Sequence, residues 1–526
     1  MPVNPTYPGV YIQEVSSGVR TISGVATSVT AFVGRAKRGP VGEPTACFNF
    51  GEFNRRFGGL WTEGPLSYAV DDFFANGGGQ ALTVRLFKPG AGDGVATLTI
   101  GNLKLRAANP GAWGNTLTGR VLWPEDKAAA EAVAGPLGLT ENDLFDLVVE
   151  DSGTGRVETF RNLAVASGAG ARRVDRVLQE GSSLVRLAKL ADGSPDLPAA
   201  LPPATPEPFP KGTGGDDGVA LAPADYLGAQ DRKTGLHALR KADLFNLLCV
   251  PPDTRGGTLD VSVRDKAAEI CAELRALYIM DPPAGWDADP DTAAAKAKAD
   301  VIGGAPVLSS LKNGSNAALF FPRLRKRDPL RGGQMDVFPP CGAVAGVMAR
   351  TDAERGVWKA PAGIAAGIAG AEELTVKLTD SENGLLNPVA VNCLRSFPVV
   401  GRVVWGSRTL KGSDQLADDY KYIPVRRLAL FIEESLYRGT QWVVFEPNDE
   451  PLWAQIRLSV GAFMQRLFRQ GAFQGASPRD AYLVKCDGET TTQDDINRGI
   501  VNILVGFAPL QPAEFVVISI QQIRSA

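Results

Sequence analysis

Sequence motifs that commonly perform catalysis are sparse in this chain of 526 residues. It contains a single histidine, His237, so a Ser-His-Asp triad would depend on that residue, and a histidine-rich zinc site cannot be built. No Gly-Lys dipeptide and no Gly-x-Ser-x-Gly pentapeptide occurs, which excludes a Walker A loop and a hydrolase-type nucleophile elbow. The surroundings of His237 predict a solvated or hydrogen-bonded loop histidine.

A glycine-rich segment follows a predicted strand at residues 81–87. Its sequence, KPGAGDG, lacks the GxGxxG spacing, and a β-like segment follows where a pyrophosphate would need a helix N-terminus. We therefore expect no nucleotide and no other cofactor.

Three pairs of adjacent carboxylates could serve as metal ligands or as acid/base groups. Such pairs more often lie in a loop, on the solvent face of a helix or in its first turn. Thr491 or Thr492 would cap a helix whose first turn contains Asp494 and Asp495. The pairs are Asp216-Asp217, Glu433-Glu434 and Asp494-Asp495. We expect no metal site and no enzyme activity.

The charge pattern argues against nucleic acid as a partner. A basic run at residues 323–331 stands in a chain of net charge -3 and has few interleaved aromatic residues, so a protein contact or a solvated surface is favoured. The six cysteines are scattered without a CxxC motif, which predicts reduced, buried thiols. The first residues do not resemble a signal peptide, and no apolar run reaches the roughly 18 residues of a membrane span.

The most regular patterning lies between residues 426 and 520. Apolar spacing predicts helices at 426–438 and 451–470, and Pro451 is tolerated in the first turn of the second helix. Residues 441–445, QWVVF, have the pattern of a buried strand. Further strands are predicted within AYLVKC, IVNILVGF and FVVISI.

In the segments before residue 426, the predicted secondary structure changes from α/β to β-rich and back to α/β. A strand at 29–33, a helix ended by glycines 77–79 and a strand at 81–87 precede a β-rich segment, 88–225, which ends in a Pro- and Gly-rich linker. From residue 238 onward strands and helices alternate, which predicts a mostly parallel sheet.

Two apolar strands lie at opposite ends of the chain: VYIQEV, ahead of the flexible spacer SSGVRTISG, and FVVISI. An unpaired strand edge is a template for another chain. The patterning leaves open whether these strands pair within their own subunit or with a neighbour.

The C-terminal sequences LFIEESLYRGTQWVVFEPNDEPLW, GAF, DGETTTQDDINRG and APLQPAEFVV resemble the contractile tail sheath family of phages and related injection systems. PGVYIQEV, TAFVGRAKRGP and FFANGGG resemble the start of these proteins, and AANPGAWGN and GGDDG recur in their larger members.

The resemblance implies a nested multidomain α/β (α+β) fold. We expect an N-terminal arm at 1–22 and a sheath core domain from 23–87 plus 390–526. A β-rich outer domain would be inserted at 88–225, and a middle α/β domain would occupy 226–389.

The resemblance also implies a mechanical function. Copies of the chain would polymerise as stacked hexameric rings around an inner tube and contract to drive it through a target envelope. Baseplate and tail-terminator or cap proteins would be further partners, with no nucleic acid and no membrane insertion. Assembly would take place in the bacterial cytoplasm, as part of a phage tail or contractile injection particle.

Carried over to this sequence, the terminal strands become links between subunits. These residues are Val10, Tyr11, Ile12, Gln13, Glu14, Val15, Phe515, Val516, Val517, Ile518 and Ile520. The candidate tube-facing residues, on the helix at 451–470, are Arg457, Arg466 and Arg469. A non-contractile structural filament and an α/β enzyme with an unrecognised site are the alternatives.

Overall fold

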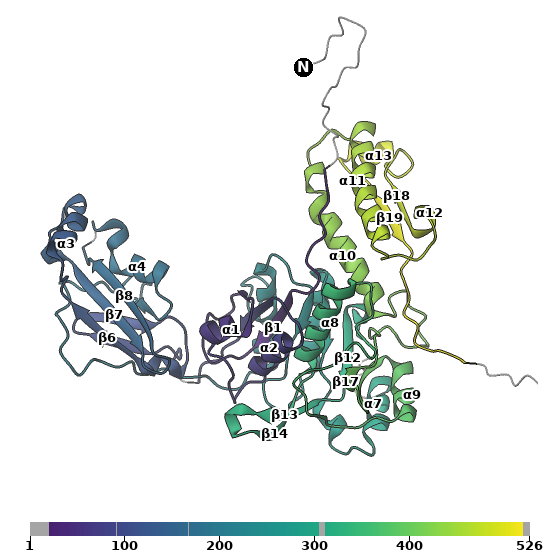
Figure 1. Ribbon diagram of the computed structural model, residues 1–526. Helices are drawn as coiled ribbons and strands as arrows, with labels where there is room; N and C mark the ends of the chain where they lie inside the picture. Colours follow the sequence, from purple (N-terminus) through teal and green to yellow (C-terminus); the bar gives the residue numbers. More distant parts are fainter. Residues whose placement is uncertain (1–19, 91, 167, 304–310, 519–526) are drawn as a thin grey trace, which may run out of the picture.

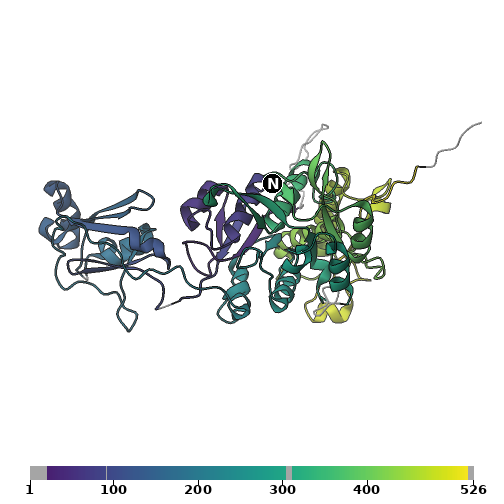
Figure 2. The same ribbon diagram turned by 90° about the horizontal axis from the view of Figure 1, so that it is seen from below.

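The computed structural model describes residues 20–90, 92–166, 168–303 and 311–518. Figures 1 and 2 show a central sheet region, an insert set apart on one side of it, and a C-terminal region of helices and a small sheet. The predicted mixture of helices with several sheets is confirmed.

The central region is built on an eight-stranded sheet in the order β17-β16-β12-β11-β10-β1-β3-β2. Its six inner strands are parallel, and the edge strands β2 and β17 are antiparallel to their neighbours, so the predicted mostly parallel sheet is confirmed. In that order the strands are Gly401–Val404, Val391–Phe397, Ala317–Phe321, Leu277–Met280, Leu247–Cys249, Thr30–Gly34, Ala81–Arg85 and Thr45–Cys47.

Helices bury both faces of this sheet, which explains why its inner strands are apolar without alternation. One face is covered by α1 (Phe50–Phe57), α2 (Leu66–Ala75) and α8 (Cys341–Arg355), and the other by α6 (Val261–Glu273) and α7 (Ala293–Ile302). Helices α2 and α8 approach closely at Gly342, where a Cβ would lie 2.0 Å from the carbonyl oxygen of Ala69. Glycine is therefore required there.

The strand order differs from the expected domain grouping. Strands from 23–87 and from 390–404 lie in the same sheet as those from 226–389, so these segments do not form separate sheets. Asn246 fixes part of this arrangement, because its side chain accepts a hydrogen bond from the Val29 amide at 3.0 Å. Apolar patterning identifies buried strands but carries no information on which of them pair.

The insert has its own core between two three-stranded sheets. The first contains β4 (Thr97–Ile100), β5 (Leu103–Ala107) and β9 (Val185–Leu187). The second contains β6 (Leu117–Leu122), β7 (Phe145–Asp151) and β8 (Arg156–Leu163). Helix α3 (Lys127–Ala134) follows β6, and α4 (Val174–Gly181) packs against the shared core.

The Pro- and Gly-rich segment at residues 194–218, here called the strap, is not the unpacked linker that its composition predicts. Its backbone bridges to Thr97 of β4 through Thr213 and to Thr118 of β6 through Lys211. Leu197 and Leu201 also pack against the insert core. Extended backbone that completes neighbouring strands satisfies its polar groups without regular structure of its own.

Candidate functional site

The C-terminal region is organised by two long helices, α10 (Ile423–Gly439) and α11 (Glu450–Arg469), as predicted. Asp449 caps α11 by accepting a hydrogen bond from the Leu452 amide at 3.2 Å, and Pro451 lies in its first turn. Ile456 and Val460 of α11 are completely buried in the core of this region.

A two-stranded antiparallel ribbon packs on this helical core. Strand β18 (Tyr482–Lys485) pairs with β19 (Leu504–Phe507), and both were predicted as strands. No third strand joins this ribbon within the described ranges, so both of its outer edges are open there. Leu483 and Leu504 are 52% and 53% exposed. Two strands alone are marginally stable in water, and open edges accept further strands.

Residues 441–445 correct the sequence prediction of a buried strand. Gln441–Val443 forms a 3-10 turn between α10 and α11, and Phe445 is fully exposed. Phe445 has a φ of 71°, which is incompatible with an extended strand. The β-branched pattern therefore marks an apolar tip on the surface instead of a core strand.

The first described residues run along α10 (Figure 1). Ile22 is buried in the C-terminal core, and a Cβ on Gly439 would lie 2.5 Å from its side chain. Arg427 of α10 donates to the carbonyl of Thr27 at 2.9 Å, and Ser435 accepts from the Val25 amide at 3.2 Å. The segment ahead of the central sheet is thereby fixed to the C-terminal region.

The C-terminal tail is fixed at Glu514. Arg408, 1% exposed, donates to both carboxylate oxygens of Glu514, at 2.9 and 2.5 Å, and its guanidinium also donates to Asp414 at 3.0 Å. Burial alone would lower the pKa of Arg408, but its bonds to Glu514 and the nearby carboxylates raise it. The tail is thus held by a bidentate ion pair at the central region.

Beyond this anchor, the described tail residues are apolar and exposed. Phe515, Val516, Val517 and Ile518 are 75%, 82%, 88% and 78% exposed, and they pair with no strand among the described residues. Val10, Tyr11, Ile12, Gln13, Glu14, Val15 and Ile520 lie outside the described residues.

The three arginines predicted to face a tube differ in their surroundings. Arg457 is half-buried and donates to Glu450 at 2.5 Å and to the carbonyl of Cys486. Arg466 is exposed but donates to the carbonyl of Ile22. Arg469 is exposed and makes no hydrogen bond or ion pair with a described residue. It is the most available cation of the three.

Sequence reasoning missed the anchors of the two chain ends. Arg408 and Glu514 are 106 residues apart and carry no local motif. A second buried pair, between Arg427 of α10 and Asp352 of α8 at 2.6 Å, joins the C-terminal region to the central one. Only the three-dimensional arrangement reveals these partners.

The other candidate groups from the sequence are buried, cap a helix, form ion pairs or lie in a strand. His237 is buried in a 3-10 helix, which corrects the prediction of a loop histidine, and burial lowers its pKa. Asp495 caps α13 (Gln493–Asn497) together with Thr492, as predicted. Glu434 is buried between Arg275 and Arg438. The basic run forms β13 (Leu324–Asp328) and the turn after it.

All six cysteines are buried and free, as predicted. Among the described residues, no group of three or more His, Cys, Asp or Glu side chains is placed to hold a metal ion. None of the helices in the described ranges combines the length and the apolar character that crossing a membrane requires.

Comparison with known proteins shows that this chain is similar to phage tail sheath proteins. Residues 416–523 match the model of the phage tail sheath C-terminal domain. The tail sheath protein of Burkholderia phage BcepMu is 26% identical over 273 residues, which cover 49% of this chain and 54% of that protein. The tail sheath protein of Vibrio phage KVP40 is 28% identical over 130 residues, 24% of this chain and 19% of that protein. The matches thus span about half and about a fifth of these relatives.

Solved structures extend the similarity over the chain. The sheath tail protein of Listeria innocua superposes with a TM-score of 0.58 at 12% identity, covering 93% of this chain and 96% of that one. The PVC sheath complex of an extracellular contractile injection system, in its contracted state, gives 0.56 at 20% identity and 99% coverage of both chains. The chain therefore has the fold of contractile sheath proteins. Its residues 416–523 match the phage tail sheath C-terminal domain, which confirms the resemblance seen in the sequence.

Proposed function

We propose that this chain is the subunit of a contractile sheath. Many copies would stack as six-fold rings around an inner tube, in an extended state that shortens and widens to drive the tube through a target envelope. The observation that carries this proposal is the exposed apolar tail at residues 515–518, in a chain whose β18-β19 ribbon has open edges. The sheath fold and the matched C-terminal domain support it.

The lattice would be linked by strand addition. Val10–Val15 of one subunit and Phe515–Ile520 of another would extend a neighbour's ribbon, and main-chain hydrogen bonds would join them. A head-to-tail contact that does not close into a ring generates a helix. The anchors at Ile22 and Glu514 would let each arm pivot without detaching from its own subunit.

The stroke would use free energy stored during assembly. Two packings of the same subunits that differ in free energy are sufficient to drive such a transition, and no nucleotide is required. The rigid units would be the central sheet and the C-terminal core, and the segments beyond the anchors would change direction between the two states.

Contact with the tube would be electrostatic and individually weak. Arg457, Arg466 and Arg469 are the proposed tube-facing cations, with Arg469 the most accessible. An exposed ion pair contributes about 0 to 1 kcal/mol, which permits release on contraction. A baseplate would trigger the sheath, a cap or terminator would close it, and assembly would occur in the bacterial cytoplasm. The insert would decorate the outer surface.

Electron microscopy of the chain, expressed alone and with its tube protein, tests the proposal. We expect short, wide, hollow cylinders from the chain alone and longer, narrower ones around the tube. Cylinders of one unchanging width would indicate a static filament. Discrete small particles under both conditions would contradict assembly altogether.

A further inference from the structure

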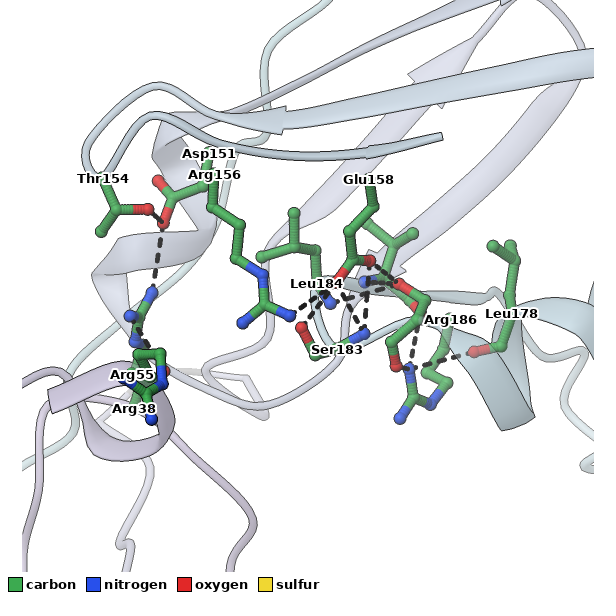
Figure 3. Close-up of polar contacts among 12 residues, drawn as sticks. Arg38, Arg55, Asp151, Thr154, Arg156, Glu158, Leu178, Ser183, Leu184 and Arg186 are labelled. Atoms are coloured by element: carbon green, nitrogen blue, oxygen red, sulfur yellow. Dashed lines mark hydrogen bonds and ion pairs between the residues drawn. The ribbon is translucent and has the colours of Figure 1, made fainter. Parts of the chain in front are cut away.

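A cleft of about 930 Å³ lies between the insert and the central region. One wall is formed by the loop after β1 and the last turn of α1, and the other by the β7–β8 turn and the connection from α4 to β9 (Figure 3). Its lining includes five arginines: Arg38, Arg55, Arg56, Arg156 and Arg186. A cavity of this size accommodates a small-molecule ligand.

On the central wall, the arginines are only partly matched by acidic groups. Arg38 donates to Asp151 of the insert at 3.2 Å and to the carbonyl of Arg55 at 3.1 Å. The side chains of Arg55 and Arg56 are exposed and make no hydrogen bond or ion pair with a described residue. Glu52, on the same helix, is engaged by the Phe48 amide at 3.0 Å.

The insert wall has the same excess of positive charge. Arg156 pairs with Glu158 at 3.2 Å, but that carboxylate also accepts hydrogen bonds from the hydroxyls of Ser182 and Ser183, both at 2.6 Å. Arg186 donates only to backbone carbonyls, among them that of Leu178 at 3.2 Å. The five guanidinium groups thus form ion pairs with only two carboxylates among the described residues, those of Asp151 and Glu158, neither of which lines the cleft.

This excess of positive charge is unfavourable for the two cleft arginines that are partly buried, Arg38 and Arg186. Burial lowers the pKa of Arg38, and the nearby charge of Arg156 adds to the effect although Asp151 opposes it. Burial also lowers the pKa of Arg186. A bound anion would oppose the lowering of the pKa of both Arg38 and Arg186. The dipole of α1 already favours cations in its last turn, so a purely structural role for Arg55 and Arg56 is the alternative to be tested.

We propose that this cleft binds a small polyanion that carries phosphate groups. Guanidinium groups form paired hydrogen bonds with phosphate oxygens. A tetrahedral phosphate directs its oxygens to several sides, so a ligand with more than one phosphate group can present oxygens to Arg55 on the central wall and to Arg156 on the insert wall. A planar carboxylate offers two oxygens in one plane. The bound anion holds the insert against the central region, in addition to the Arg38–Asp151 ion pair.

Equilibrium dialysis of the full-length chain with pyrophosphate tests this proposal. We expect one saturable site per chain, weakened at least tenfold in a variant with Arg55→Ala and Arg156→Ala. The matched control removes two exposed arginines of the insert that do not line the cleft, Arg161→Ala and Arg176→Ala. Both variants lose the same charge, so the control distinguishes a site from general attraction. Circular dichroism verifies that both are folded.

Equal weakening in the two variants, or binding that does not saturate, would overturn the proposal. Tricarballylate, a tricarboxylate, is expected to bind at least tenfold more weakly than pyrophosphate, and equal affinity would contradict the phosphate assignment. A glycerol phosphate oligomer provides the second arm. Tighter binding of pyrophosphate supports a free phosphate ligand, and tighter binding of the oligomer supports a phosphodiester polymer.

Discussion

The insert and the C-terminal region both contain small antiparallel sheets, but strand edges are paired by the strap in the insert and left unpaired in the C-terminal region. In the insert, the strap bridges to β4 through Thr213 and to β6 through Lys211, so it covers both strands. In the C-terminal region, β18 and β19 have no further partner within the described residues, and the apolar tail stays exposed. The insert completes itself, whereas the C-terminal region is completed by other subunits if the proposed function is correct.

The strap and the C-terminal tail are both extended backbone, but the strap packs closely against its own domain and the tail does not. Gly212 of the strap approaches its own domain so closely that a Cβ would lie 2.0 Å from the carbonyl oxygen of Gly114. The tail beyond Glu514 approaches nothing comparable, because Phe515 to Ile518 are at least 75% exposed. Exposed apolar chain is unfavourable in an isolated subunit, which supports the proposed contact with a neighbouring subunit.

Removing the tail should have the largest effect on assembly. Deletion of residues 515–526, or of residues 1–17, should give a folded subunit that forms no long sheaths, because strand addition between subunits is lost. Sedimentation and electron microscopy measure this outcome. Sheaths of normal length from either truncation would refute the proposed linkage.

Excision of the insert is the matched control for these truncations. The amide of Val219 donates to the carbonyl of Lys88 at 2.9 Å, so a short Gly-Ser linker can replace residues 90–217. This variant should still form cylinders, with a smaller outer diameter. Loss of assembly would show that the insert is itself part of the lattice.

Weakening the insert core should affect stability but not assembly. Phe145 is completely buried between the two sheets of the insert, so Phe145→Ala should cost about 3 to 5 kcal/mol in free energy of unfolding. Calorimetry should show that one transition moves to lower temperature while the rest of the chain is unchanged. A single shifted transition would mean that the insert does not unfold independently.

The central sheet should respond to pH in a way that the insert does not. Burial raises the pKa of Asp281 to about 7, although the Cys341 amide donates to it at 2.9 Å. Because the folded state holds this proton more tightly than the unfolded state, stability falls as pH rises from about 4 to about 7. Asp281→Asn should stabilise the chain at pH 8 by on the order of 2 kcal/mol and have little effect at pH 4. Urea denaturation at both values measures the difference, and an equal effect at both would contradict this assignment.

Reversing one exposed charge should have the smallest effect. Arg469→Glu should leave the free energy of unfolding within about 0.5 kcal/mol of the parent but reduce co-assembly with the tube protein severalfold. Arg479→Glu, an equally exposed change on α12 (Pro478–Ala481), is the control. Unchanged co-assembly in the Arg469 variant would exclude this residue from the tube contact.

Local patterning predicted the elements better than their arrangement. The helices α10 and α11, the cap at Thr492 and the parallel character of the central sheet follow from spacing, capping and alternation within short segments. The position of β1 between β10 and β3 does not, because strand pairing is decided by contacts between residues more than 200 positions apart, such as Val29 and Asn246.

Two of the incorrect predictions have clear physical causes. Residues 441–445 are apolar and β-branched, but they form a surface tip where Phe445 has a positive φ. The strap has the composition of a linker but is fixed by backbone pairing that needs no apolar pattern. The anchors at Arg408 and Glu514 left no sequence signal, because a single buried ion pair between distant residues is not a motif.

A helical reconstruction of the assembled chain by cryo-electron microscopy tests the central claim most directly. The account predicts that the β18-β19 ribbon gains strands from neighbouring subunits, with residues 515–518 of one subunit paired in the ribbon of another. A ribbon that stays two-stranded in the assembly, or that pairs with the tail of its own subunit, would contradict it.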